Sequence, residues 1–131
     1  FNFKINFSLE KYIQAFFDKI ANTILDYKIL KAEDKPIGLC GFVKRDFLDH
    51  ADIGFALLPE YEGNGYAYEA ACETMNYGLS ALQIKTIFAI TTFENSKSKK
   101  LLHKIGLHEI GAIHPDIYDT DLLLYSNEKT S

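Results

Sequence analysis

The sequence lacks three features that would each indicate a particular class of protein. Its two cysteines, Cys40 and Cys72, are too few and too far apart for a disulfide framework, and they fit a reducing cytoplasm. It has no apolar run approaching the roughly 18 residues that a membrane span needs. It has no excess of positive charge, since a net charge of −4 argues against general binding to nucleic-acid phosphates. We therefore expect a cytoplasmic protein with neither nucleic acid nor membrane as a general partner.

The composition is that of an ordinary globular domain. The 131 residues include 47% apolar and 24% charged residues, which is typical of a folded soluble chain. There is no internal repeat, low-complexity stretch or linker, so we expect a single domain over residues 1–131. The chain begins with Phe1, not Met, and we expect it to belong to a longer product. Its opening residues lack the apolar core of a signal peptide.

The first half of the sequence predicts one helix and three strands. Residues 8–25 carry apolar side chains at spacings of three and four, which predicts an amphipathic helix. Residues 27–34 and 37–44 are β-like and are joined by a turn predicted at residues 34–36. Residues 51–58 form a third predicted strand, antiparallel to the second because the connection is short.

The second half of the sequence predicts two helices that alternate with strands, and it completes the predicted fold. Residues 63–82 predict a helix that opens from a glycine turn, and 84–92 predict a strand buried on both faces. A second helix over 94–106 ends at a glycine, and a hairpin of residues 107–113 and 119–126 closes the chain. This order predicts an α/β (α+β) fold with helices packed on a mixed, mostly antiparallel sheet.

The glycine turn at residues 59–67 is the most informative segment. Gly63 and Gly65 permit unusual backbone angles and close approach of a ligand. Unpaired amides at the start of the following helix favour an anion such as a phosphate group. The alternative is that the glycines only turn the chain. No Lys-Ser/Thr pair follows, which excludes a P-loop, and the full dinucleotide-binding pattern is absent.

Three segments in the right order resemble the GNAT superfamily of N-acyltransferases. The acetyl-CoA signature (Gln/Arg)-x-x-Gly-x-(Gly/Ala) aligns with Glu62 through Gly65 to Ala67, where Gly65 and Ala67 match it and Glu62 departs from it. Residues 63–70 are similar to the Gly-x-Gly-Tyr-Ala-x-Glu-Ala string of the branch that acetylates ribosomal-protein N-termini, the ribosomal-protein-alanine N-acetyltransferase-like branch. Segments 95–107 and 119–125 resemble later parts of the same family, so the resemblance covers about residues 8–126.

The resemblance implies a bacterial-type, acetyl-CoA-dependent N-acetyltransferase. It would transfer an acetyl group by direct attack of a primary amine, either a peptide or protein N-terminus or a small amine. The implied fold is GNAT-like, with the cofactor-binding core at residues 51–107 and a first strand and helix missing before the segment seen here. Acetyl-CoA is the implied co-substrate, with no metal, and a homodimer is left open.

The resemblance also implies a set of cofactor-binding residues. Those expected to bind the CoA pyrophosphate through backbone amides are Gly63, Asn64, Gly65, Tyr66 and Ala67. Those expected to pair with pantetheine as an added strand are Phe55, Ala56 and Leu57. Asn95 would bond to the pantetheine arm, and Ser98 would lie near the thioester sulfur. Glu62 departs from the usual residue, and its carboxylate would weaken CoA binding unless it points into solvent.

Four lysines stand close together in an otherwise acidic protein. They are Lys97, Lys99, Lys100 and Lys104. We expect them to attract CoA phosphates, with a solvated helix face as the alternative. Cations near a helix start are unfavourable, so an anion nearby would compensate for them.

Asp52 is the preferred residue to take the amine proton or to orient the amine. The family that the sequence resembles often carries at this position a Glu that acts through water. The alternative role of Asp52 is to bind a neighbouring backbone group or lysine. His50 would share one strand face with Asp52, and its ordinary pKa suits a base, but a surface histidine is the simpler interpretation.

The acid that protonates the leaving thiolate is less defined. Many relatives carry a tyrosine where this sequence has Leu102, which leaves Ser98, Tyr118, Tyr125 or water. Asp52 and Ser98 are therefore the expected catalytic residues. Cys72 is expected in the core, not as a nucleophile. The histidines lack ligand spacing, so we expect no metal site.

Two other functions remain as alternatives. One is a non-catalytic acyl-CoA-binding or sensing domain on the same fold, which the absent tyrosine and the unusual Glu62 favour. The other is a module that binds nucleotide phosphates and shares only the glycine turn.

Overall fold

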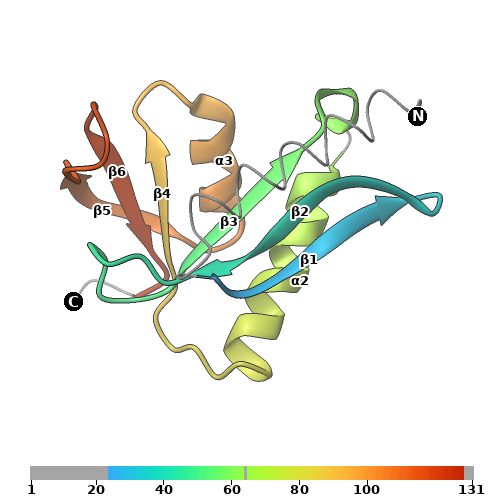
Figure 1. Ribbon diagram of the computed structural model, residues 1–131, viewed down its shortest axis with the longest axis horizontal. Helices are drawn as coiled ribbons and strands as arrows, with labels where there is room; N and C mark the ends of the chain where they lie inside the picture. Colours follow the sequence, from blue (N-terminus) through green and yellow to red (C-terminus); the bar gives the residue numbers. More distant parts are fainter. Residues whose placement is uncertain (1–23, 64, 129–131) are drawn as a thin grey trace.

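One sheet organises the part of the chain that the computed structural model describes, residues 24–63 and 65–128 (Figure 1). Within these residues six strands form the sheet in the order β1-β2-β3-β4-β6-β5. The strands are β1 (Ile24–Ala32), β2 (Lys35–Val43), β3 (Asp52–Leu57), β4 (Phe88–Thr92), β5 (His108–Ile113) and β6 (Leu122–Ser126). Neighbouring strands are antiparallel except β3 and β4. The predicted mixed, mostly antiparallel sheet is confirmed.

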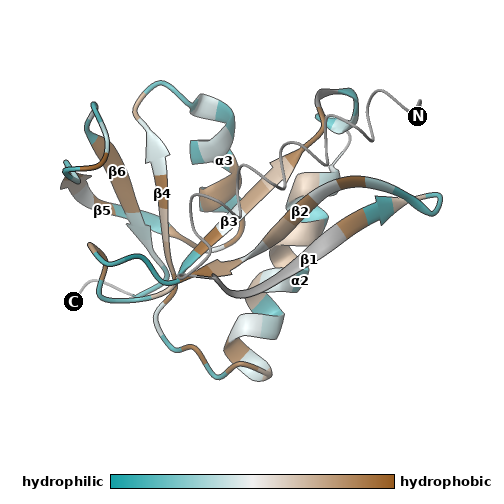
Figure 2. Ribbon diagram, in the orientation of Figure 1, coloured by the Kyte–Doolittle hydropathy of each residue, from teal (hydrophilic) through white to brown (hydrophobic). Residues whose placement is uncertain are grey.

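Two helices of the described residues pack on the sheet, α2 (Tyr66–Ser80) and α3 (Ser96–Lys104), and a short 3₁₀ turn, η1 (Pro59–Tyr61), precedes α2. Met75 of α2 and Leu102 of α3 belong to one buried cluster with Phe42 and Ile53 of the strands. Both helices therefore cover the same face, and each buries one apolar stripe there. Figure 2 shows apolar residues along β2, β3 and β6 and hydrophilic residues in several of the connecting loops.

The first hairpin turns earlier than predicted. Its two-residue loop is Glu33 and Asp34, with φ of 51° and 64°, and Lys35 and Pro36 already belong to β2. Positive φ at both loop residues matches the right-handed twist of the flanking strands. Pro36 is tolerated in the strand because β3 pairs with β2 only from Gly38 onward, so no β3 carbonyl needs its missing N–H.

Two other predicted element boundaries differ from those in the structure. The end of the predicted helix 8–25 is wrong, because Ile24 begins β1; its residues 8–23 lie outside the described part of the chain. The predicted strand 84–92 begins only at Phe88, and it is buried on one face, not on both. The glycine-opened helix, the helix that ends before Gly106 and the final hairpin are confirmed.

The parallel pair β3 and β4 touches at one end only. Its single register pair is Asp52 with Phe88, and the two strands then separate, as Figure 1 shows. On its other edge β3 pairs with β2 along its whole length, from Val43–Asp52 to Gly38–Leu57. The sheet is thus closed on one side of β3 and open on the other.

Gly38 of β2 allows this strand to lie close to β3. A Cβ at this position would lie 2.2 Å from the backbone oxygen of Ala56. We expect Gly38→Ala to lower the free energy of unfolding by about 2 kcal/mol or more, because backbone must move to relieve the clash. Gly54→Ala is the matched control, since its Cβ would meet nothing within 4 Å. Urea unfolding measures both, and equal stability of the two variants would contradict this packing.

Candidate functional site

A cleft of about 830 Å³ lies where β3 and β4 separate. All residues of β3, from Asp52 to Leu57, line it. The cleft therefore runs along the edge of β3 that faces β4. Residues from the glycine turn, from α3 and from the segment before β6 complete its wall; they include Gly63, Gly65, Ala67, Asn95, Ser98 and Tyr118.

The wall contributed by β3 has backbone groups that no neighbouring strand uses. Beyond Asp52 the described strands give β3 no partner on the β4 side. Peptide groups on an unpaired strand edge can bond to an extended ligand as if it were another strand. The predicted pantetheine-binding residues Phe55, Ala56 and Leu57 all lie on this part of β3 and line the cleft.

The glycine turn forms one end of the cleft. Gly63 and Gly65 both have φ of 81°, and a Cβ on either would meet nothing within 4 Å. Gly65 is the N-cap of α2 and provides no side chain to bond the first amides of the helix. Those amides favour an anion. The structure thus brings Gly63, Gly65 and Ala67 to the cleft, whereas Asn64 lies outside the described residues.

Three of the four predicted lysines line the cleft, namely Lys97, Lys100 and Lys104. Lys104 also places Nζ 5.7 Å from the centre of the Tyr68 ring. Lys99 is turned elsewhere and donates a 2.8 Å hydrogen bond to the Phe93 carbonyl. Glu62 is exposed and also lines the cleft. Positive charge therefore exceeds negative charge at the end of the cleft beside α3.

Asn95 and Ser98 meet at the start of α3. Asn95 is the N-cap, and its Oδ1 accepts a 3.0 Å hydrogen bond from the Ser98 amide. This is the ordinary reason for an asparagine before a helix. Both residues also line the cleft, so the capping bond fixes Asn95 where the cleft passes α3.

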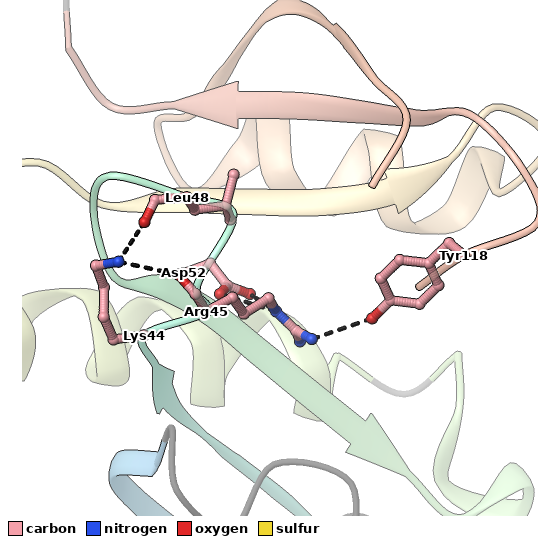
Figure 3. Close-up of polar contacts among 5 residues, drawn as sticks. All are labelled: Lys44, Arg45, Leu48, Asp52 and Tyr118. Atoms are coloured by element: carbon pink, nitrogen blue, oxygen red, sulfur yellow. Dashed lines mark hydrogen bonds and ion pairs between the residues drawn. The ribbon is translucent and has the colours of Figure 1, made fainter. Parts of the chain in front are cut away.

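A buried carboxylate lies at the closed end, where β3 and β4 meet. Asp52 is 1% exposed. Arg45 Nε donates to both of its carboxylate oxygens, at 3.0 and 3.2 Å, and Arg45 Nη1 donates to the Tyr118 hydroxyl at 3.1 Å (Figure 3). Burial raises the pKa of Asp52 to about 6, although the charge and hydrogen bonds of Arg45 act to lower it. Asp52 therefore titrates close to neutral pH.

Three further contacts hold the loop that carries Arg45. Lys44 Nζ donates to the carbonyls of Arg45 and Leu48, which ties the loop between β2 and β3 to itself (Figure 3). The rings of Phe47 and Tyr118 pack edge to face with centroids 6.0 Å apart. The loop before β3 and the segment before β6 are thus joined at the cleft.

The predicted pairing of His50 with Asp52 on one strand face is wrong. β3 begins at Asp52, so His50 belongs to the preceding loop, where it is exposed. Its ring packs edge-on against Phe88 at 5.1 Å and does not line the cleft. Asp52, Gly54 and Ala56 do line it, and so do Ile53, Phe55 and Leu57.

The structure also shows where the other candidate residues for proton transfer or nucleophilic attack lie. Leu102 and Tyr125 are 1% and 3% exposed and belong to the core, whereas Tyr118 lines the cleft. Cys72 is half-buried on α2 with a free thiol. Sequence reasoning missed Arg45, although it is the only arginine in the sequence, and this rarity was the available signal.

The described residues lack two further features, a metal-binding cluster and a membrane-spanning helix. They contain no group of three or more His, Cys, Asp or Glu side chains placed to hold a metal ion. None of the helices in residues 24–63 and 65–128 is long and apolar enough to cross a membrane.

Comparison with known proteins places the sequence among acetyltransferases. It is 37% identical over 84 residues to the uncharacterized N-acetyltransferase YnaD of Bacillus subtilis, a match covering 63% of this chain and 49% of the relative. It is 28% identical over 96 residues to the putative ribosomal N-acetyltransferase YdaF of B. subtilis, covering 67% and 52%. It is 25% identical over 91 residues to spermidine N(1)-acetyltransferase of Escherichia coli K12, covering 69% and 49%. The chain spans about half the length of these curated relatives.

A solved structure agrees with the sequence matches. The GNAT-family acetyltransferase from Bacillus anthracis superposes with a TM-score of 0.63 at 30% identity, covering 75% of this chain and 61% of that one. A family model described as an acetyltransferase (GNAT) domain matches residues 6–108. Because that match spans more than half of the sequence, the chain belongs to the GNAT acetyltransferase family.

Proposed function

We propose that this chain binds acetyl-CoA in the cleft between β3 and β4 and transfers the acetyl group to a primary amine. One observation carries the proposal: a single cleft joins an unpaired strand edge, a glycine turn at a helix start and a buried carboxylate. The strand edge can bond to an extended arm that contains amides, and the glycine turn can bind a pyrophosphate. The carboxylate can remove a proton.

The cofactor would lie along the cleft with its phosphates at the glycine turn. The backbone amides of residues 63–67 would bind the pyrophosphate, supported by Lys97, Lys100 and Lys104. Pantetheine would run beside residues 55–57 of β3, with its other side toward Asn95 and Ser98. This arrangement directs the thioester to the closed end of the cleft, where Asp52 lies.

Asp52 is proposed as the base, acting directly or through one water. The amine attacks in its neutral form, and its nitrogen becomes positively charged as the C–N bond forms and must then lose a proton. A base is most effective in this step when its pKa is near the working pH. The pKa of Asp52, raised by burial to about 6, meets this requirement better than an exposed carboxylate would. The neutral amine attacks the carbonyl carbon, its nitrogen gives one proton to Asp52, the C–S bond breaks, and no covalent enzyme intermediate is needed.

Two acceptor classes follow from the relatives. One similar protein is named a putative ribosomal N-acetyltransferase, and another is named a spermidine N(1)-acetyltransferase. For this chain we propose the α-amine of a peptide as the first acceptor to test, because residues 63–70 match the string typical of that branch. A polyamine is the second acceptor to test.

Thermal unfolding with different ligands tests the cofactor assignment. At about 100 times its Kd a ligand adds roughly 2.7 kcal/mol of stability. We expect acetyl-CoA to raise Tm and ATP at the same concentration to leave it nearly unchanged. Stabilisation by ATP alone would instead support a nucleotide-phosphate module. Stabilisation by acetyl-CoA without transfer to any amine would support an acyl-CoA-sensing domain.

A further inference from the structure

We propose that Tyr118 donates the proton that the departing CoA thiolate takes up, and that Arg45 positions Tyr118 for this step. The proposal rests on the proposed acetyl transfer. Tyr118 belongs to the segment of residues 114–121 between β5 and β6, and it lines the same cleft as Asp52.

The hydrogen bond from Arg45 leaves the proton of Tyr118 unused. A guanidinium has only donors, so in the 3.1 Å contact the phenol oxygen is the acceptor. The phenol hydrogen therefore takes no part in this contact and is available to an acceptor in the cleft. After that proton has left, the same guanidinium remains as a donor to the phenolate oxygen.

Arg45 also brings the acid close to the base. The same guanidinium bonds to Asp52 and to Tyr118, which are 66 positions apart in the sequence (118 − 52). Removal of the amine proton and protonation of the sulfur occur at neighbouring atoms of one tetrahedral intermediate. Two groups held by one side chain at the closed end of the cleft satisfy this geometric requirement.

The other hydroxyls are less suitable. Tyr125 is buried in the core, and the position of the family's usual tyrosine is Leu102, which is also buried. Tyr68 lines the cleft at the opposite end, beside the glycine turn and Lys104. Ser98 lines the cleft, but an aliphatic hydroxyl is a much weaker acid than a phenol, whose ordinary pKa of about 10 is near the value of about 8.5 for a thiol.

The step balances without any additional reagent. The amine nitrogen forms a bond to the carbonyl carbon, and its proton goes to Asp52. The C–S bond then breaks, the sulfur takes the electron pair, and the Tyr118 hydroxyl supplies the proton that makes the thiol. Asp52 is left protonated and Tyr118 deprotonated, and water in the cleft returns one proton from the first to the second.

The test compares two donors that differ only in the leaving atom. Acetyl-CoA needs a proton donor, whereas in acetyl-seleno-CoA the selenolate is a stable leaving group. With acetyl-CoA we expect Tyr118→Phe to lower kcat about 100-fold without raising KM for the donor. With the selenoester the same variant should stay within about threefold of the wild type. Tyr125→Phe, which removes a hydroxyl outside the cleft, is the control and should change neither rate.

Arg45→Lys tests the positioning role and is a second variant should Tyr118→Phe fold poorly. Lysine retains a positive charge for Asp52 but lacks the fork that reaches Tyr118 as well. We expect turnover of acetyl-CoA to fall about tenfold more than turnover of the selenoester, because the altered contact with Asp52 affects both donors and the lost contact with Tyr118 affects only the thioester. Equal slowing of both donors, or full activity of Tyr118→Phe with acetyl-CoA, would overturn the proposal. If the wild-type chain of 131 residues binds acetyl-CoA but acetylates no amine, the proposed function fails and the role of Tyr118 fails with it.

Discussion

Asp52→Asn is expected to lower kcat for acetyl transfer about 100-fold or more, which is the usual contribution of a positioned base. Asparagine has nearly the same size and keeps an oxygen that can accept from Arg45, but it cannot take up the amine proton. The substitution does not alter either partner of the hydrogen bond from Arg45 to Tyr118. Affinity for acetyl-CoA should therefore stay within about twofold, since the lost interaction acts in the reaction and not in binding.

The pH dependence separates a base from a structural carboxylate. Asp52 accepts a proton only in its charged form, and its pKa is about 6. As pH falls below this value, log(kcat/KM) of the wild type should fall by one further unit for each pH unit, beyond the slope that the acceptor amine itself causes. In Asp52→Asn the break near pH 6 should be absent. A variant with unchanged turnover, or with the same break, would remove Asp52 from the role.

Gly65→Val is expected to weaken acetyl-CoA binding by about 100-fold or more. The φ of Gly65 is 81°, a conformation that a β-branched residue adopts only with strain. The new side chain would also enter the open space beside the turn that we assign to the pyrophosphate, where a Cβ now meets nothing within 4 Å. Loss of close approach removes several backbone hydrogen bonds to phosphate at once.

Gly106→Val is the matched control for backbone strain. Gly106 has φ of 95° and open space around its Cβ position, but it follows α3 and does not line the cleft. Both variants should lose stability to a similar degree, whereas only Gly65→Val should lose binding in isothermal titration with acetyl-CoA. Equal affinities in the two variants would show that the glycine turn is not the phosphate site.

The parts of the fold that were predicted correctly have local signals. Gly65 and Gly106 mark one helix start and one helix end because their positive φ is required there, and such requirements are visible in the sequence. The burial of Met75 follows from helical spacing in the same way. The glycine turn was singled out from the same local signal, whereas Phe55, Ala56 and Leu57 were named only from the family resemblance.

The predictions that were wrong or missing concern residues whose structure depends on contacts with residues distant in the sequence, or on the detailed geometry of a turn. The hairpin turn fell on Glu33 and Asp34, although Pro36 is the stronger turn residue, because strand twist selects the loop. His50 was placed on β3, but that strand begins only where Asp52 meets Phe88. Arg45 and Tyr118 are 73 positions apart, and no spacing rule connects them before the chain is folded.

The most direct test of the account is to mix the chain with acetyl-CoA and a panel of amines and to measure both products. The panel contains peptides with free α-amines, the same peptides with blocked α-amines, and spermidine. We predict release of CoA thiol in equal amount to an acceptor whose mass has increased by one acetyl group, and loss of both signals in Asp52→Asn. Binding of acetyl-CoA with no acetylated amine anywhere in the panel would contradict the account.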